Sequence, residues 1–177
     1  MGRARLSAVV RPAAVADLDA ISEIFAWYVH HTVATFEEAP RPAREWRELH
    51  ALLNDLGLPF LVAEADGAIT GYAYASPWRQ KPGYRHTVED SVFVLPGRTG
   101  QGTGRLLLAG LLSSCPAAGA RQVIAVIADS GSEASIALHA AHGFALAGRL
   151  TQVGYKHGRW IDTLLMQKEL EPSGPTR

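Results

Sequence analysis

Thr87 to Leu108 reads TVEDSVFVLPGRTGQGTGRLLL, and this stretch decides the fold. Its first part, up to Val94, is rich in β-branched and aromatic residues, which predicts a strand. Pro96-Gly97 ends that run, and leucines then recur at the spacing of a helix. The stretch therefore predicts a strand, a glycine-rich loop and a helix in direct succession.

The loop has the composition of an anion-binding site, although a helix entry that merely needs flexible residues is the alternative. Gly100, Gly102 and Gly104 let the backbone turn tightly, and a helix that opens near Thr103 adds unpaired amides and a positive dipole end. A Walker loop would need Lys and then Ser or Thr after Gly104, where Arg105-Leu106 stands. A dinucleotide fingerprint would need a different glycine spacing and an acid about twenty residues later. A phosphate or pyrophosphate is therefore expected here, bound in neither of these two ways.

The whole chain has the composition of one globular domain. It has 177 residues, 47% of them hydrophobic, which is enough for one compact core and short for two domains. The 17 acidic and 17 basic residues balance, so no excess of charge attracts nucleic acid or an anionic membrane. Cys115 is the single cysteine, which excludes an internal disulfide. Met1 to Leu6 lacks the apolar core of a signal peptide, and no stretch approaches the roughly 20 apolar residues of a bilayer span, so a cytoplasmic protein is expected.

Hydrophobic periodicity and turn residues predict a mixed α/β chain. Asp66-Gly67 separates two strand-like runs and favours a two-residue hairpin turn. Pro42 and Gly57 bracket a helical pattern. The expected strands cover 8–12, 60–64, 69–75, the central run up to 94, 122–128, a strand that begins at 144, and two last strands near 149–156 and 159–168. The expected helices cover 14–31, 43–55, the leucine-rich stretch after 103, and 133–142, and the last residues, 171–177, are expected to form a loose tail.

This order of elements, together with the loop TGQGTG at residues 99–104, resembles the GNAT acetyltransferase superfamily. Thr99 departs from that family's loop pattern, which has Arg or Gln at this position, and Arg98 is expected to supply the charge instead. The resemblance covers roughly residues 8–170. It implies an α/β (α+β) GNAT fold in one domain, 1–170, with a mixed, mostly antiparallel twisted sheet of about seven strands flanked by about four helices.

Several separate blocks are most similar to the phosphinothricin and methionine-sulfoximine N-acetyltransferases of this superfamily. They are Thr35 to Glu37, Tyr74 to Arg79, Tyr84 to Val94, Ser135 to His139 and Gly154 to Asp162. The resemblance implies acetyl-CoA as cosubstrate, a small amino-acid-like amine as acceptor, and a homodimer, with Trp160 as a candidate interface residue. A non-catalytic acyl-CoA sensor, or an enzyme acting on a protein N-terminus or a polyamine, is the alternative.

Acetyl-CoA is expected to lie along the central strand and the glycine loop, with a backbone amide near Val92 to Val94 polarising the thioester carbonyl. In many relatives an Asn that contacts the pantetheine stands at the position of Ser132, a shorter substitute. The predicted cofactor contacts are Val92, Phe93, Val94, Arg98, Thr99, Gly100, Gln101, Gly102, Thr103, Gly104, Ser132 and Ser135.

Glu89 and His139 are the candidate catalytic residues. Glu89 is an acid immediately before the cofactor strand and is expected to be the general base; the alternative is a surface carboxylate, or an ion pair with Arg85 or His86. His139 takes the position where many GNAT enzymes have a tyrosine that protonates the departing thiolate, and a packed helix histidine is the alternative. The other histidines show no ligand spacing, so no metal is expected.

The acceptor site is expected to combine arginines with aromatic walls. Arg79 and Arg85 flank a Pro-Gly turn, from which they could converge on an α-carboxylate, although solvated loop charges are the alternative. The residues predicted to contact the substrate are Phe36, Trp78, Arg79, Tyr84, Arg85, Thr87, Val88 and Glu89. Phosphinothricin, methionine sulfoximine and methionine sulfone are the leading substrates that the resemblance implies, and the paired arginines speak against a polyamine.

Overall fold

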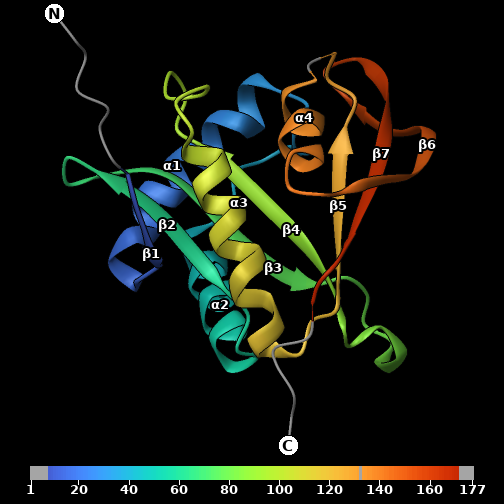
Figure 1. Ribbon diagram of the computed structural model, residues 1–177. Coiled ribbons are helices and arrows are strands. Elements are labelled where there is room, and N and C mark those ends of the chain that lie inside the picture. The colour runs from blue at the N-terminus through green and yellow to red at the C-terminus, as the bar shows by residue number, and fades with distance from the viewer. Residues whose placement is uncertain (1–7, 132, 172–177) are drawn as a thin grey trace, which may run out of the picture.

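The computed structural model describes residues 8–131 and 133–171 of the chain, and these form a twisted sheet with helices on both faces (Figure 1). The sheet order is β1-β2-β3-β4-β5-β7-β6. The strands are β1 (Val9–Pro12), β2 (Phe60–Ala65), β3 (Ala68–Pro77), β4 (Thr87–Val94), β5 (Gln122–Ala128), β6 (Ala145–Lys156) and β7 (Arg159–Glu169). The helices are α1 (Leu18–His31), α2 (Ala43–Asp55), α3 (Thr103–Ser114) and α4 (Ala134–Ala140), with short 3-10 turns at Val15–Asp17, Pro82–Tyr84 and Cys115–Ala118. The expected mixed, mostly antiparallel sheet of about seven strands, flanked by about four helices, is confirmed.

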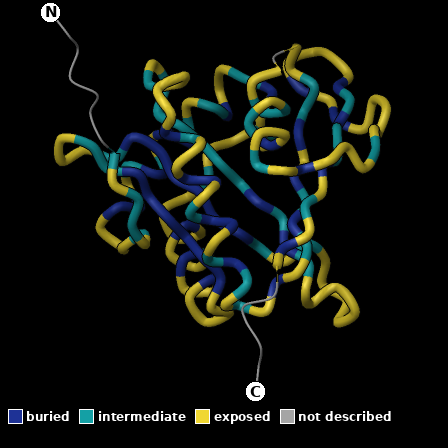
Figure 2. The backbone as a smooth tube through the Cα atoms, in the orientation of Figure 1, coloured by how far each residue is buried: buried dark blue, intermediate teal, exposed yellow. Residues whose placement is uncertain are grey.

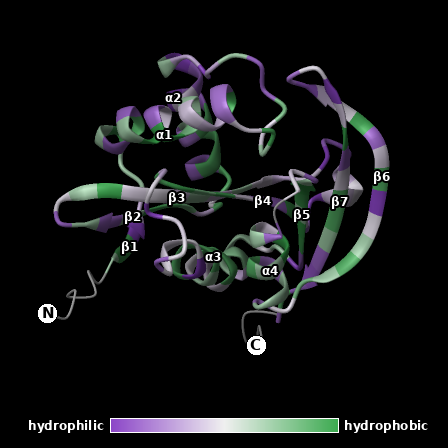
Figure 3. Cartoon of the chain, turned by 90° about the horizontal axis from the view of Figure 1, so that it is seen from above, coloured by the Kyte–Doolittle hydropathy of each residue, from purple (hydrophilic) through white to green (hydrophobic). Residues whose placement is uncertain are grey.

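One pair of neighbouring strands runs parallel, and it is short. β4 and β5 pair at Thr87, Val88 and Glu89, opposite Gln122, Val123 and Ile124, whereas all other neighbours in the sheet are antiparallel. Beyond Glu89 the two strands diverge, and Figure 1 shows them separating toward the end that carries α4. Seen from above, α1 and α2 cover one face of the sheet, and α3 and α4 cover the other (Figure 3). The divergence therefore opens a gap that both layers of helices border.

The two faces of the sheet are packed differently. Under α1 and α2 lies an aromatic cluster, in which the ring centres of Phe25 and Trp46 are 5.5 Å apart and those of Trp46 and Tyr72 are 5.8 Å apart. On the other face, α3 packs its own leucines against the sheet, among them Leu107 and Leu111, which are fully buried. Burial of each such side chain contributes roughly 1.5–3 kcal/mol to folding. Figure 2 shows the buried backbone concentrated in the central strands.

Most predicted boundaries agree with the structure, and the C-terminal region is where they differ. The two-residue turn at Asp66-Gly67 is confirmed, with both residues at positive φ (53° and 73°), and the helix at 43–55 has the predicted bounds. The strand expected from Phe144 and the one expected near 149–156 form one continuous strand, β6. Its pairing with β7 slips between Leu150 and Gly154, because β6 carries extra residues there, and this bulge looks like a break in the sequence. The expected tail lies outside the described residues except for Glu171.

None of the helices in residues 8–131 and 133–171 combines the length and the apolar composition that a bilayer crossing requires.

Candidate functional site

The gap between β4 and β5 is a cleft of about 2130 Å³. Its walls are formed by residues Glu89 to Val94 of β4 and by Ala125 to Ala128 of β5, and it continues to the glycine loop and to α4. The pairing of β4 with β5 ends at Glu89, so polar groups on the edges of both strands that face the cleft are available to a ligand. An extended ligand arm can therefore add to the sheet at this place.

The glycine loop closes one end of the cleft with free backbone amides. Gly100 and Gly102 have positive φ values of 75° and 91°, a conformation that favours glycine, and α3 starts directly after them at Thr103. The amides of residues 99–105 donate to no described residue. The guanidinium groups of Arg98 and Arg105 line the same end and have no acidic partner among the described residues. Free amides, a helix start and two cations are the features of an anion site.

Glu89 lies on the wall of the cleft where β4 and β5 separate. Alternate residues of a strand face the same side, so Glu89 and Ser91 share the face of Phe93, whose ring centre is 5.6 Å from that of Phe25 on α1. The side chain is half-buried. Burial raises the pKa of the Glu89 carboxyl, the charge of Asp90 adds to the rise, and Arg79 opposes it. A carboxylate with a raised pKa in a cleft is suited to accept a proton.

Asp90 points to the opposite face of β4, where it contacts His139 of α4. Nε2 of His139 is 2.9 Å from a carboxylate oxygen of Asp90, and Nδ1 is 2.7 Å from the Ser135 carbonyl oxygen. Both side chains are buried. Burial lowers the pKa of His139, but the hydrogen bond and charge of Asp90 and the Ser135 carbonyl outweigh it, so the pKa is raised overall. His139 lines the cleft with both ring nitrogens occupied, and the predicted acid role requires one of these bonds to break.

The segment between α1 and α2 is held against β6. Nζ of Lys156, a buried residue, donates to the Thr35 carbonyl oxygen at 2.7 Å, and burial lowers the pKa of this ammonium. The Phe36 ring lies directly on Gly154, where an added Cβ would be 2.3 Å from the ring. Gly154 is therefore required for Phe36 to take this place in the wall of the cleft.

Several predicted contacts meet in the cleft. Phe36, Glu89, Val92, Phe93, Val94, Arg98, Thr99, Gly100, Gln101, Gly102, Thr103, Gly104, Ser135 and His139 all line it. Ser132 lies outside the described residues. The predicted cofactor residues that the structure describes therefore converge on one continuous surface.

The predicted arginine pair lies elsewhere. Arg79 stacks on Trp78, with its guanidinium carbon 4.7 Å from the ring centre, and Arg85 donates to the nearby Pro82 carbonyl at 3.1 Å. The residues Trp78, Arg79, Tyr84, Arg85, Thr87 and Val88 are not part of the cleft lining. The charge of Arg79 nevertheless acts on the cleft, because it opposes the rise in the pKa of the Glu89 carboxyl.

Sequence reasoning missed Asp90, Arg41 and Arg159. Asp90 pairs with a residue 49 positions away, Arg41 reaches the cleft from a segment that carries no motif, and Arg159 lies in the block Gly154 to Asp162, where no role was predicted for it. The acid-acid pair Glu89-Asp90 was the one usable signal, because side chains on adjacent strand positions face opposite sides and thus serve different partners.

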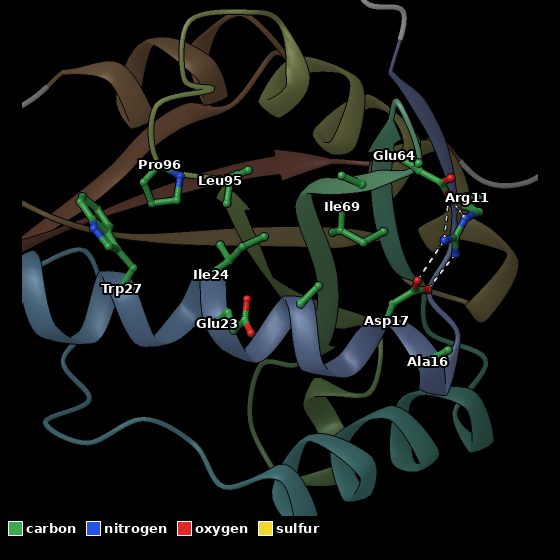
Figure 4. Close-up of a pocket in the computed structure, with 13 residues that line it drawn as sticks. Arg11, Ala16, Asp17, Glu23, Ile24, Trp27, Glu64, Ile69, Leu95 and Pro96 are labelled. Atoms are coloured by element: carbon green, nitrogen blue, oxygen red, sulfur yellow. Dashed lines mark hydrogen bonds and ion pairs between the residues drawn. The ribbon is translucent and has the colours of Figure 1, made fainter.

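A second groove, of about 710 Å³, lies beside α1 (Figure 4). At one end Arg11 binds Asp17 at 2.7 Å and Glu64 at 2.8 Å, and Trp27 lies toward the other end. The charge of Arg11 is thus already paired with two carboxylates. Neither Glu89 nor the glycine loop lines this second groove. The cleft between β4 and β5 is therefore the candidate active site.

Comparison with known proteins agrees with this geometry. Residues 10–165 match the acetyltransferase (GNAT) domain family. The chain is 49% identical to a phosphinothricin N-acetyltransferase of Alcaligenes faecalis, over 98% of this chain and 88% of the relative. It is 40% identical to an L-methionine sulfoximine/L-methionine sulfone acetyltransferase of Salmonella typhimurium, over 92% and 94%. The crystal structure of a phosphinothricin acetyltransferase from Sinorhizobium meliloti in complex with AcCoA superimposes with a TM-score of 0.88 at 43% identity, over 96% of this chain and 91% of that one. The cleft, the glycine loop and these matches agree, and the chain belongs to the GNAT acetyltransferase family.

Proposed function

We propose that this protein transfers acetyl from acetyl-CoA to the α-amine of a small amino acid of the phosphinothricin, methionine sulfoximine or methionine sulfone type, in a ternary complex with Glu89 as general base. The observation that carries the proposal is a half-buried carboxyl with a raised pKa on the wall of a cleft that ends in a loop of free amides. The names of the relatives support the substrate class.

The described residues fit acetyl-CoA. The amides of residues 99–105, with Arg98 and Arg105, would hold the pyrophosphate, because they combine donors and positive charge at the start of α3. The unpaired edges of β4 and β5 would bind the amide groups of the pantetheine arm. A backbone amide near Val92 to Val94 would then polarise the thioester carbonyl.

Glu89 accepts, directly or through a water, the proton that the amine loses as it attacks the thioester carbon. The bond from carbon to sulfur breaks, and the leaving thiolate takes up a proton from His139, the proposed acid, once one of the hydrogen bonds of its ring has broken. Since its pKa is raised above the ordinary glutamate value, the Glu89 carboxylate is more basic than an exposed one, and proton transfer to it is more favourable. Arg79 lies outside the cleft lining, and since its charge reaches Glu89 we propose that it attracts the α-carboxylate of the same substrate electrostatically.

The test is thiol release from acetyl-CoA across a panel of acceptors. The panel contains phosphinothricin, methionine sulfoximine, methionine sulfone, ordinary amino acids, a polyamine and short peptides. We expect the amino-acid analogues to be acetylated with the highest kcat/KM. Preferential turnover of peptides or polyamines would contradict the substrate class, and acetyl-CoA binding without turnover of any amine would contradict the activity.

Substitution of Gly154 by alanine is expected to raise KM for the amino acid roughly 10-fold, with KM for acetyl-CoA unchanged. The new Cβ takes the place of the Phe36 ring, which must leave the wall of the cleft, and a changed apolar contact of this size is worth about 1–3 kcal/mol in substrate discrimination. Gly148→Ala is the matched control on the same strand, because nothing lies within 4 Å of its added Cβ. Equal kinetics for both variants would exclude Phe36 from the acceptor site.

We also propose a homodimer through the hairpin of β6 and β7. This hairpin exposes Leu146, Leu150, Val153, Tyr155 and Trp160, and the last is 62% exposed. An apolar strip of this kind on a sheet edge favours association. In sedimentation velocity we expect a dimer for the wild type and a monomer for the double variant Leu150→Glu/Trp160→Glu. Leu52→Glu, which places the same charge on an exposed leucine of α2, should remain dimeric.

A further inference from the structure

Arg41 presents a charged group to the cleft without an acidic partner among the described residues. It precedes α2, lines the cleft and is half-buried. Its guanidinium carbon lies 4.6 Å from the ring centre of Trp46 and 5.6 Å from that of Phe25. A guanidinium stacked on a ring uses its face for that contact and keeps its N–H edge for an oxyanion. The aromatic cluster thus holds a fork of donors at the side of the cleft.

The surroundings of Arg41 contain more donors than acceptors. Nε1 of Trp46 and the hydroxyl of Tyr72 are buried and have no hydrogen-bond partner in the described part of the chain. Burial raises the pKa of the Tyr72 phenol well above its ordinary value, and the nearby charge of Arg41 acts in the opposite direction. Trp46 and Tyr72 are not part of the cleft lining, so Arg41 is the donor of this cluster that a ligand in the cleft can reach, and its guanidinium favours a group rich in acceptor oxygens.

The position of Arg41 suits the far end of an amino acid whose amine lies near Glu89. Arg41 contacts Phe25, and the Phe25 ring centre is 5.6 Å from that of Phe93. Phe93 and Glu89 share a face of β4, and the strand rise places them about 13 Å apart. A substrate that lies along this face, with its amine between the two residues, directs its side-chain head group toward Arg41.

We infer that Arg41 binds the anionic side-chain head group of the acceptor and so makes the enzyme prefer phosphinothricin to methionine sulfone. The inference rests on the proposed function and names the specificity residue of the same site. Both substrates carry an α-carboxylate, which therefore cannot distinguish them. The phosphinate of phosphinothricin is negatively charged and the sulfone is neutral, and a guanidinium binds an oxyanion in bidentate fashion.

The experiment compares kcat/KM for phosphinothricin and methionine sulfone in four proteins: wild type, Arg41→Met, Arg41→Lys and Arg159→Met. Methionine keeps much of the packing on Trp46 and removes the charge, and lysine keeps the charge and removes the fork. Arg159 is the matched control, because it is a second arginine of the cleft with no acidic partner among the described residues.

Arg41→Met should lower kcat/KM for phosphinothricin roughly 10- to 100-fold, the usual effect of losing a charge-assisted hydrogen bond, and should change that for methionine sulfone less than about threefold. Arg41→Lys should fall between wild type and Arg41→Met. Equal losses for both substrates in Arg41→Met would mean a packing role and would overturn the inference, as would a selective loss confined to Arg159→Met.

Calorimetry with CoA-bound protein separates this inference from the proposed function. Wild-type protein should bind phosphinothricin more tightly than methionine sulfone, and Arg41→Met should lose this preference. A preference that depends on Arg41 without any turnover would support the inference and contradict the proposed function. Turnover of both substrates with no dependence on Arg41 would do the reverse.

Discussion

Glu89→Gln is expected to lower kcat/KM for the amino-acid substrate by about 10²- to 10⁴-fold, the range typical of losing a general base. Glutamine keeps the size and much of the polarity of the side chain but cannot accept the proton of the amine. KM for acetyl-CoA should stay near the wild-type value, since the glycine loop and the strand edges are unaltered. Steady-state thiol release at saturating acetyl-CoA measures the effect.

The role of Glu89 as general base also predicts how kcat/KM depends on pH. The base acts as a carboxylate, so kcat/KM should fall on the acid side as Glu89 becomes protonated. Because its pKa is raised above the ordinary 4.5, this acid limb should lie at higher pH than for an exposed glutamate, and Glu89→Gln should abolish the limb. Glu23→Gln, in the separate groove beside α1, is the control and should keep both rate and limb. A Glu89→Gln variant with nearly full activity would assign proton removal to another group.

Asp90→Ala is expected to reduce the free energy of unfolding by about 3–5 kcal/mol, because breaking a buried ion pair leaves the other partner buried without compensation. The Asp90 side chain is 2% exposed and that of His139 5%. Urea unfolding of the wild type, both single variants and the double variant Asp90→Ala/His139→Ala gives the coupling energy. A double variant as unstable as the sum of the two single variants would mean that the pair contributes nothing by its interaction.

The same pair predicts a pH dependence of stability. The pKa of His139 in the folded protein is raised above 6.5, so the folded protein binds this proton more tightly than the unfolded chain does. The stability from this source is fully present below pH 6.5 and is lost as the pH rises through the raised pKa. Asp90→Ala should lose this dependence. Titration of the His139 ring by NMR in wild type and in the variant checks the sign directly.

The chain order of the fold was predictable because its signals are local. Thr87 to Leu108 contains a strand, a turn and a helix in sequence, and Asp66-Gly67 favours one turn type. The bulge between Leu150 and Gly154 was not predictable, because it depends on Asp162 of β7, which accepts a hydrogen bond from the Gln152 amide at 2.8 Å. A partner from another strand cannot be inferred from the periodicity of one strand.

The residues of the candidate site likewise fall into those that local sequence predicts and those that only tertiary contacts bring to the cleft. The glycine loop and Glu89 lie within one short stretch and were found from it, and the structure places them on one cleft. Arg41 enters the cleft because α2 packs Trp46 beneath it, a tertiary contact that leaves no mark on the residues around position 41. Arg79 and Arg85 attracted attention as a flanking pair, yet their local contacts are with Trp78 and with a backbone carbonyl. Two charged residues that flank a turn therefore do not predict which site their side chains reach.

The short parallel pairing between β4 and β5 also determines how the two parts of the sheet are joined. The sheet consists of two halves, β1 to β4 and β5 to β7, that hydrogen-bond to each other at Thr87 to Glu89. Glu89 is the last residue of β4 that pairs with β5, so the proposed base lies where the two strands are still joined, and the open strand edges begin directly after it. A substitution that breaks these few pairs is therefore expected to alter the position of the base and the width of the cleft together.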